Sequence, residues 1–174
     1  MNHTLTILPL LITDLPELRK LSQEIWYAHY SSVLSIEQIE YMLNLMYEAE
    51  VITHEINCQA ILYNKAIANQ LQNQPMVGYL SYGLETTEEN TYLKLHKCYL
   101  LPALHGYGYG QFLLSHVWEQ AKYMNVHKIV LNVNKKNDKA IKAYSRFGFK
   151  IISSEIKHIG NGFVMDDYIM AYEY

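Results

Sequence analysis

Hydrophobic and polar positions follow two different periods along the chain, and these periods predict a mixture of helices and strands. Apolar residues recur at helical spacing over residues 15–30, and again behind Ser35, where Gln38 three residues later completes a capping box. Strand-like runs follow at residues 76–84 and 92–101, and the polar turn between them predicts a hairpin. The other predicted elements are a strand at 5–8, helices at 111–124 and 137–147, and strands at 128–134, 149–154 and 167–172.

Residues 56–74 are ambiguous, because their apolar positions suit a helix whereas residues 60–63 also suit a strand. No linker rich in glycine, serine or proline and no internal repeat is visible, so we expect a single domain over residues 1–174. From residue 92 onward the order strand, loop, helix, strand, helix, strand requires a sheet with helices on its faces. The predicted fold class is therefore α/β.

Composition narrows the class of protein. The chain has 174 residues, 50% of them hydrophobic and 18% charged, which is enough to fill a core. Its formal charge of −3 leaves no overall basic field for nucleic acid. Cys58 and Cys98 form no CxxC pair, which favours a reducing compartment and predicts no metal site. Pro9 interrupts the apolar run at 5–12, so we expect a cytoplasmic chain with no signal peptide and no membrane segment.

A glycine-rich loop is the most informative segment. A strand ends before Pro102, and Gly106, Gly108 and Gly110 then lead directly into an amphipathic helix. Glycines let backbone N–H groups turn toward one point, and a helix start adds partial positive charge, so such a loop can hold a pyrophosphate. The spacing GxGxG differs from GxGxxG, and no GxxxxGK[ST] is present, which argues against a dinucleotide or nucleoside triphosphate site. The structural alternative is an ordinary tight connection.

A second motif follows one strand later and gives the chain its family resemblance. Together with the loop, it resembles the GNAT (Gcn5-related N-acetyltransferase) superfamily over essentially the whole chain. The family's loop signature falls on His105, Gly108 and Gly110, with His105 in place of the usual glutamine or arginine. The tail at 160–170 is similar to bacterial spermidine acetyltransferases. The residues of the second motif are Asn137, Ala140, Tyr144, Gly148 and Phe149.

The resemblance implies a mixed, mostly antiparallel central sheet with helices on both faces. It also implies that two splayed strands hold the pantetheine arm of acetyl-coenzyme A, with main-chain groups of residues 99–101 pairing to it as if it were another strand. The implied coenzyme contacts are Tyr99, Leu100, Leu101, His105, Gly106, Tyr107, Gly108, Tyr109, Gly110, Gln111, Asn137, Lys139, Ala140 and Tyr144.

Tyr144 is the candidate catalytic residue, since the resemblance implies that its hydroxyl donates to the departing thiolate. With reference pKa values of about 8.5 for a thiol and about 10 for tyrosine, complete proton transfer is uphill by about 2 kcal/mol, so hydrogen bonding to the sulfur is the larger contribution. The alternative is a core tyrosine. Asn137 suits a helix cap and a pantetheine contact equally well. Cys98 lies in a hydrophobic strand, which favours a buried structural thiol over a nucleophile.

The acceptor pocket implied by the resemblance is built from the first two helices and nearby hairpins. Carboxylates beside aromatic rings suit a cation, although a solvated helix face and half-buried rings would show the same pattern. The general base stays unassigned: Lys94 stands where many relatives have glutamate, and His96, Glu85 and a water relay are equally admissible. The candidate acceptor residues are Trp26, Tyr27, Tyr30, Glu37, Glu40, Tyr41, Glu85 and His96.

The predicted function is transfer of acetyl from acetyl-coenzyme A, by direct attack, to a primary amine such as a polyamine or diamine. Three alternatives stay open: an acetyltransferase acting on protein amines, a non-catalytic acyl-coenzyme A sensor or interaction protein, and a nucleotide-binding α/β protein. Homodimerisation through the last strands is common among relatives, but nothing in the residues decides it.

Overall fold

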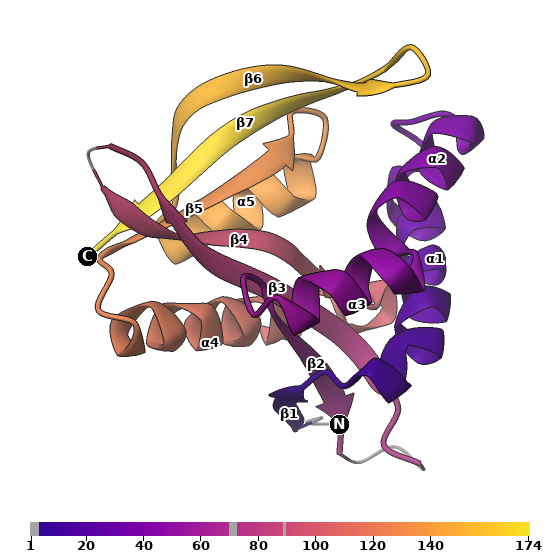
Figure 1. Cartoon of the computed structure of the whole chain (residues 1–174), viewed down its shortest axis with the longest axis horizontal. Coiled ribbons are helices and arrows are strands. Elements are labelled where there is room, and N and C mark those ends of the chain that lie inside the picture. The colour runs from indigo at the N-terminus through magenta and orange to yellow at the C-terminus, as the bar shows by residue number, and fades with distance from the viewer. Residues whose placement is uncertain (1–3, 70–72, 89) are drawn as a thin grey trace. The chain divides into compact units, whose positions relative to one another are not determined.

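Seven strands pair into one mixed sheet, and the chain also forms helices between them (Figure 1). The computed structural model describes residues 4–69, 73–88 and 90–174. The strands are β1 (Leu5–Pro9), β2 (Leu62–Ala68), β3 (Met76–Thr86), β4 (Thr91–Leu100), β5 (Lys128–Asn134), β6 (Lys150–Gly160) and β7 (Phe163–Glu173). Their order is β1-β2-β3-β4-β5-β7-β6. The ladders β1–β2, β5–β7 and β6–β7 are antiparallel and β4–β5 is parallel, which confirms the mixed, mostly antiparallel sheet.

The chain forms two compact units, each assembled from two segments. The first unit comprises Met1–Ser81 and Lys97–Gly110, and the second comprises Tyr82–His96 and Gln111–Tyr174. β3 and β4 each run through both units, because the two boundaries at 81/82 and 96/97 fall within these strands.

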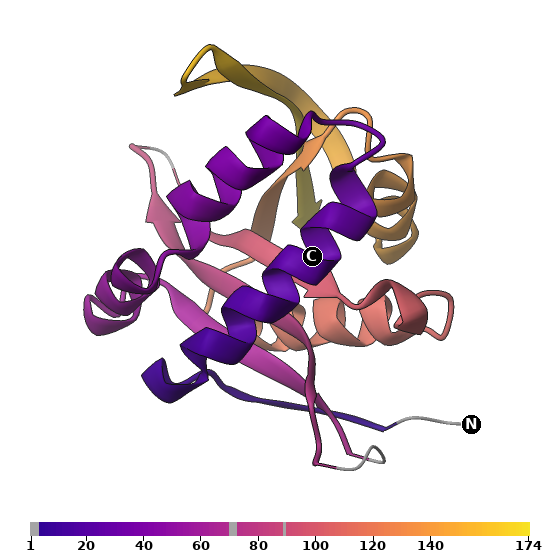
Figure 2. The same cartoon turned by 90° about the vertical axis from the view of Figure 1, so that its right-hand side faces the viewer.

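The first unit contains α1 (Leu15–Tyr30), α2 (Ile36–Tyr47) and α3 (Ala49–Asn57). α1 and α2 pack side by side, as Figure 2 shows. The predicted cap of α2 is confirmed, because the Gln38 N–H donates to Ser35 Oγ at 3.2 Å. The fully buried side chains of Leu18, Ile39 and Ile52, one from each helix, form part of the core.

The ambiguous stretch at 56–74 turns out to contain the end of one helix and a complete strand. α3 ends at Asn57, and the left-handed Gln59 (φ +53°) reverses the chain before β2 begins. β2 pairs with β1 from Leu5–Ala68 to Pro9–Asn64. The strand alternative was the better interpretation but began two residues early, and residues 70–72 lie outside the described ones. Local periodicity could not decide, since the strand is specified by a partner far away in the sequence.

The second unit contains α4 (Tyr109–Tyr123) and α5 (Asp138–Phe147). Asn137 caps α5, because its Oδ1 accepts from the Ala140 N–H at 3.1 Å. Gly148 ends α5 with φ +120°, where a Cβ would lie 3.0 Å from the Tyr172 ring. β6 and β7 form a long hairpin (yellow in Figure 1) that extends well beyond the predicted strands at 149–154 and 167–172. Its outer part is mostly exposed, so the hydrophobic alternation that marks a strand is weak there.

Candidate functional site

The glycine-rich loop lies between β4 and α4, after one 3-10 turn at Pro102–Leu104. Gly106 and Gly108 both have φ of +86°, a left-handed conformation that is costly for a residue with a side chain. A Cβ built at Gly106, Gly108 or Gly110 would meet no neighbouring atom within 4 Å. Residues 105–108 are also exposed. The backbone of the loop is therefore reachable from solvent, as the binding of a diphosphate requires.

Some main-chain N–H and carbonyl groups at the end of β4 already form hydrogen bonds within the first unit. The Leu101 N–H donates to the Val77 carbonyl of β3 at 2.8 Å. Because main-chain groups alternate in direction along a strand, the N–H and carbonyl of Leu100 point away from β3. His105 Nε2 lies 3.0 Å from the Leu100 carbonyl oxygen, and since a carbonyl can only accept, Nε2 carries the proton there. Two of the main-chain groups predicted to hold a pantetheine arm are thus already hydrogen-bonded. His105 serves as the hydrogen-bond donor to one of them, the Leu100 carbonyl.

The predicted coenzyme contacts on α4 and α5 make several bonds inside the second unit. Gln111 Nε2 donates to the Ala143 carbonyl at 3.0 Å, and Asn137 is used as the cap of α5. Tyr144 is half-buried, with its ring centroid 5.8 Å from that of Phe149 in an edge contact. The remaining predicted contacts of this group are exposed or half-buried: Tyr107, Tyr109, Lys139 and Ala140.

Two of the candidate acceptor residues lie in a buried aromatic cluster formed by Trp26, Tyr30, Tyr47, Tyr79 and Tyr99. The Trp26 indole N–H donates to the Tyr47 hydroxyl at 3.2 Å, and the hydroxyls of Tyr47 and Tyr79 are 2.8 Å apart. Trp26 is 2% exposed and Tyr30 is 9% exposed. Burial raises the pKa of Tyr47, Tyr79 and Tyr99 well above the usual value, so these hydroxyls stay protonated. The cluster is a hydrogen-bonded part of the first unit's core.

Tyr27 and Glu40 lie instead on the surface of the first unit. The Tyr27 hydroxyl donates to Glu40 Oε1 at 3.1 Å, and both border a hollow of about 200 Å³. Glu37 is exposed, and hydrogen bonds from its own backbone N–H and from Ser35 lower its pKa. Tyr41 is half-buried. The candidate acceptor residues of the first two helices thus divide into a buried pair and a more exposed group.

Lys97 is a buried charged residue that the sequence analysis did not identify. It is 5% exposed, its Nζ donates to the Tyr63 hydroxyl at 2.7 Å, and Glu55 Oε2 is 3.8 Å away. Burial lowers the pKa of Lys97, and Glu55 opposes this. The signal was available, because strand alternation places Lys97 on the same side of β4 as the buried Leu93 and Leu95.

The candidates for a general base lie in the second unit. The Tyr92 hydroxyl donates to Glu85 Oε2 at 2.9 Å, and Lys94 Nζ donates to Asn132 Oδ1. Burial lowers the pKa of Lys94, whereas the nearby carboxylates raise it. His96 is half-buried. Asp167 of β7, which the sequence analysis left without a role, is 4% exposed and close enough to influence Lys94.

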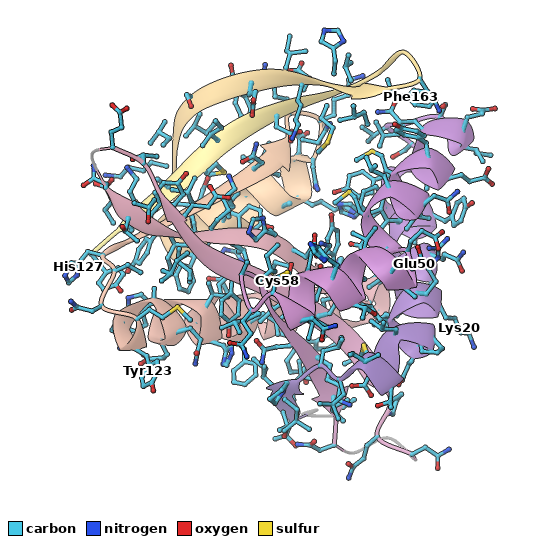
Figure 3. All side chains as sticks on the ribbon, viewed as in Figure 1. Lys20, Glu50, Cys58, Tyr123, His127 and Phe163 are labelled. Atoms are coloured by element: carbon cyan, nitrogen blue, oxygen red, sulfur yellow. The ribbon has the colours of Figure 1, made fainter. Side chains whose placement is uncertain are left out.

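The two cysteines have different surroundings, and only those of Cys98 disfavour a nucleophile. Burial raises the pKa of the Cys98 thiol to about 12, which disfavours the thiolate. Cys58 is exposed at the end of α3, with Sγ 3.6 Å from His54 Nε2 (Figure 3). Within residues 4–69, 73–88 and 90–174, no group of three or more histidine, cysteine or acidic residues could hold a metal ion. No helix in those ranges is both long and apolar enough to cross a bilayer.

The chain is similar to known acetyltransferases in sequence. Residues 15–149 match the sequence profile of the Acetyltransferase (GNAT) family. The chain belongs to this family. An uncharacterised N-acetyltransferase of Mycobacterium tuberculosis is 31% identical over 94 residues, which are 54% of this chain and 60% of that protein. The match therefore spans less than two thirds of this curated relative.

Solved structures show the same fold over almost the whole length of this GNAT chain. PaiA N-acetyltransferase from Thermoplasma acidophilum, in complex with coenzyme A, has a TM-score of 0.79 at 23% identity and covers 98% of this chain and 99% of its own. Arabidopsis thaliana NAA60 with a bisubstrate analogue has a TM-score of 0.76 at 17% identity, with the same coverage. A chimera of spermidine N-acetyltransferase SpeG from Vibrio cholerae and hSSAT has a TM-score of 0.69 at 20% identity, covering 97% and 95%. These likenesses confirm the GNAT fold.

Proposed function

We propose that this protein transfers acetyl from acetyl-coenzyme A to the primary amine of a small cationic acceptor. The observation that carries the proposal is the open glycine loop at the start of α4, whose left-handed Gly106 and Gly108 leave the backbone accessible. Such a loop can direct N–H groups at a diphosphate without any basic side chain, which suits a chain whose formal charge is −3. Bound acetyl-coenzyme A would supply the thioester carbonyl that the amine attacks.

The residues of the chain then have distinct tasks. The amides around Gly108 hold the diphosphate, and the outward-facing main chain at Leu100 orients the pantetheine arm. In this arrangement the His105 imidazole must share or release the Leu100 carbonyl, to which it now lies 3.0 Å away. Tyr144 donates a hydrogen bond to the departing sulfur, since complete transfer of its proton to a thiolate is uphill by about 2 kcal/mol.

A small cationic amine is the acceptor class that we favour, with polyamines and diamines as its best representatives. Glu37 and Glu40 present carboxylates beside the Tyr27 and Tyr41 rings on α1 and α2, and carboxylates with aromatic faces attract an ammonium group. The likeness to a spermidine N-acetyltransferase chimera adds support. Protein amines are the competing acceptor class, as the likeness to NAA60 in complex with a bisubstrate analogue illustrates.

The proposal is tested with calorimetry and a panel of acceptors. We expect the protein to bind acetyl-coenzyme A and to acetylate spermidine or a diamine in preference to peptides. Turnover of peptide N-termini or lysines alone would overturn the acceptor class. Binding without turnover of any amine would identify a sensor instead, and stronger thermal protection by ATP or NAD than by coenzyme A would identify a nucleotide-binding protein.

Tyr144→Phe is expected to lower kcat by about tenfold to a hundredfold while the Kd for acetyl-coenzyme A stays unchanged, because the lost hydrogen bond forms only as the sulfur departs. Steady-state kinetics and calorimetry measure the two quantities. Tyr123→Phe removes the same hydroxyl from an 87% exposed position at the end of α4 (Figure 3) and should change neither. An unchanged kcat in Tyr144→Phe would remove this hydroxyl from the mechanism.

A further inference from the structure

One face of the sheet in the second unit carries a row of polar side chains across three strands. The registers place Asn134 of β5 opposite Asp167 of β7, and Asp167 opposite Glu155 of β6. Directly paired residues project from the same face, so the three side chains are neighbours. The register of β4 against β5 puts Lys94 on this face too, where its Nζ donates to Asn132. We call Asn134, Asp167 and Glu155 the polar row.

Asp167 is the buried member of the polar row. It is 4% exposed, and its Oδ1 has no hydrogen-bond partner among the described residues. Its neighbour Asp166 is different, because that side chain is 47% exposed and forms an ion pair with Lys135 at 2.5 Å. A buried carboxylate oxygen loses its hydrogen bonds to water, and this loss is unfavourable when no protein group replaces them. A ligand with an N–H or O–H donor would supply the missing hydrogen bond.

The surroundings of Asp167 make it an unusually good proton acceptor for a carboxylate. Burial, followed by the charges of Asp166 on the same strand and Glu155 on β6, raises the pKa of Asp167 to about 6. Lys94 on β4 and Lys135 after β5 act in the opposite direction. Compared with the ordinary value of 3.8, such a group binds its proton about a hundredfold more tightly yet is still mostly ionised at pH 7.

The polar row lies at the end of β5 from which α5 begins. Asn134 is the last residue of β5, and α5 starts at Asp138. The Lys135 N–H donates to the Asp166 carbonyl at 3.0 Å, which ties this turn to β7. The β4–β5 ladder ends three residues earlier on β5, at the pair Leu95–Leu131. Asp167, which pairs with Asn134, and α5, which carries Tyr144, therefore both lie at the same end of β5, beyond its ladder with β4.

We propose that Asp167 is the general base that accepts a proton from the ammonium group of the acceptor, an inference that rests on the proposed acetyltransferase function. One N–H proton passes to Asp167 Oδ1, and the freed lone pair forms the C–N bond to the thioester carbonyl carbon as the C–S bond breaks. The second proton lost by nitrogen ends on the sulfur, to which the Tyr144 hydroxyl donates a hydrogen bond. Asp167 then releases its proton to solvent, which leaves amide and thiol as products.

Two other groups on this side of the second unit are less suited to the task. Glu85 Oε2 already accepts a hydrogen bond from the Tyr92 hydroxyl at 2.9 Å. Lys94 donates to Asn132, and an ammonium group has no lone pair with which to accept a proton. Lys94 instead has the charge to hold Asp167 in its ionised form until the acceptor binds.

The test compares Asp167→Asn with the matched control Asp166→Asn in the full chain, using spermidine as acceptor between pH 6.5 and 9.5. At pH 7 we expect kcat/KM of Asp167→Asn to fall by about a hundredfold or more. The loss should shrink about tenfold for each pH unit, because an alkylamine with a pKa near 10.4 increasingly supplies its own neutral form. Asp166→Asn lowers the pKa of Asp167 but keeps the base, so it should not show this pH-dependent loss. His96→Gln, at the alternative base, should not show it either.

Three outcomes overturn the assignment. A loss in Asp167→Asn that is the same at every pH would indicate a structural role, and no loss would remove Asp167 from the proton transfer. His96→Gln with the pH behaviour expected of Asp167→Asn would move the base to His96. Failure of the proposed function looks different, because the wild-type protein itself would then leave spermidine unacetylated, and the base proposal would fall with it.

Thermal unfolding supplies a readout that does not depend on activity. The pKa of Asp167 in the folded protein, about 6, lies above its usual 3.8, so its protonated form favours folding at low pH and this contribution is lost as pH rises through 6. Asparagine is neutral throughout. The Tm of Asp167→Asn relative to the wild type should therefore rise between pH 4 and pH 7, whereas a flat difference would contradict an unpaired buried carboxylate.

Discussion

Gly108→Val is expected to weaken acetyl-coenzyme A binding by about a hundredfold or more. Gly108 has φ of +86°, and a side chain there would project into open space beside the exposed loop, where we place the diphosphate. Losing two hydrogen bonds to a charged phosphate, at about 1.5 kcal/mol each, corresponds to about a hundredfold in Kd. Isothermal titration calorimetry with coenzyme A and acetyl-coenzyme A measures the effect.

Gly162→Val is the matched control for this experiment. Gly162, in the turn between β6 and β7, also has a positive φ, +76°, and a Cβ there would likewise meet nothing within 4 Å. The two variants therefore share the backbone strain of a β-branched residue in a left-handed conformation and differ in their place in the fold. Equal coenzyme affinity in Gly108→Val and Gly162→Val would mean that the glycine loop does not bind the diphosphate.

Trp26→Ala is expected to lower the free energy of unfolding by about 3 to 5 kcal/mol, the range for removing a large buried aromatic side chain. Trp26 is 2% exposed, contacts the rings of Tyr30, Tyr47 and Tyr99, and donates to the Tyr47 hydroxyl. The substitution leaves both a cavity and a hydroxyl without its donor. Urea unfolding followed by circular dichroism measures the change.

Tyr27→Ala provides the comparison at the next residue of α1. Tyr27 is 36% exposed, and its hydroxyl bonds only to the exposed Glu40 among the contacts described. Its removal should cost about 1 kcal/mol or less, as is usual for surface positions. Similar losses of stability in Trp26→Ala and Tyr27→Ala would contradict the placement of Trp26 in the core, and would return it to the surface of an acceptor pocket.

Elements with strong local signals could be predicted from the sequence. The strand at 128–134 has the predicted bounds, because it is a nearly continuous apolar run. Ser35 and Asn137 begin helices as predicted, since a cap bonds to a backbone N–H only three residues away. Residues 49–57 were not predicted as a helix, and residues 56–74 stayed ambiguous, because the pairing of β2 with β1 joins residues about 60 positions apart.

The candidate site likewise contains residues that the sequence could identify and contacts that it could not. The glycine loop and Tyr144 were identified from short motifs and their family resemblance. The bonds that occupy the Leu100 carbonyl and the Leu101 N–H were not, because they depend on how His105 and β3 approach β4. Asp167 was missed because a single charged residue in a strand does not reveal whether water or protein surrounds it. Lys97 was missed although its alternation with Leu93 and Leu95 along β4 indicated a buried position.

From its order of residues alone, this chain specifies an α/β fold, the positions of most helices and strands, and a loop suited to phosphate. These features depend on periodicity, caps and glycine conformation, all of which act over a few residues. The burial of Trp26 and the unpartnered oxygen of Asp167 required the folded structure. Burial and pKa depend on neighbours brought together from distant segments, as Asp167 meets Asn134 and Glu155 only when three strands pair.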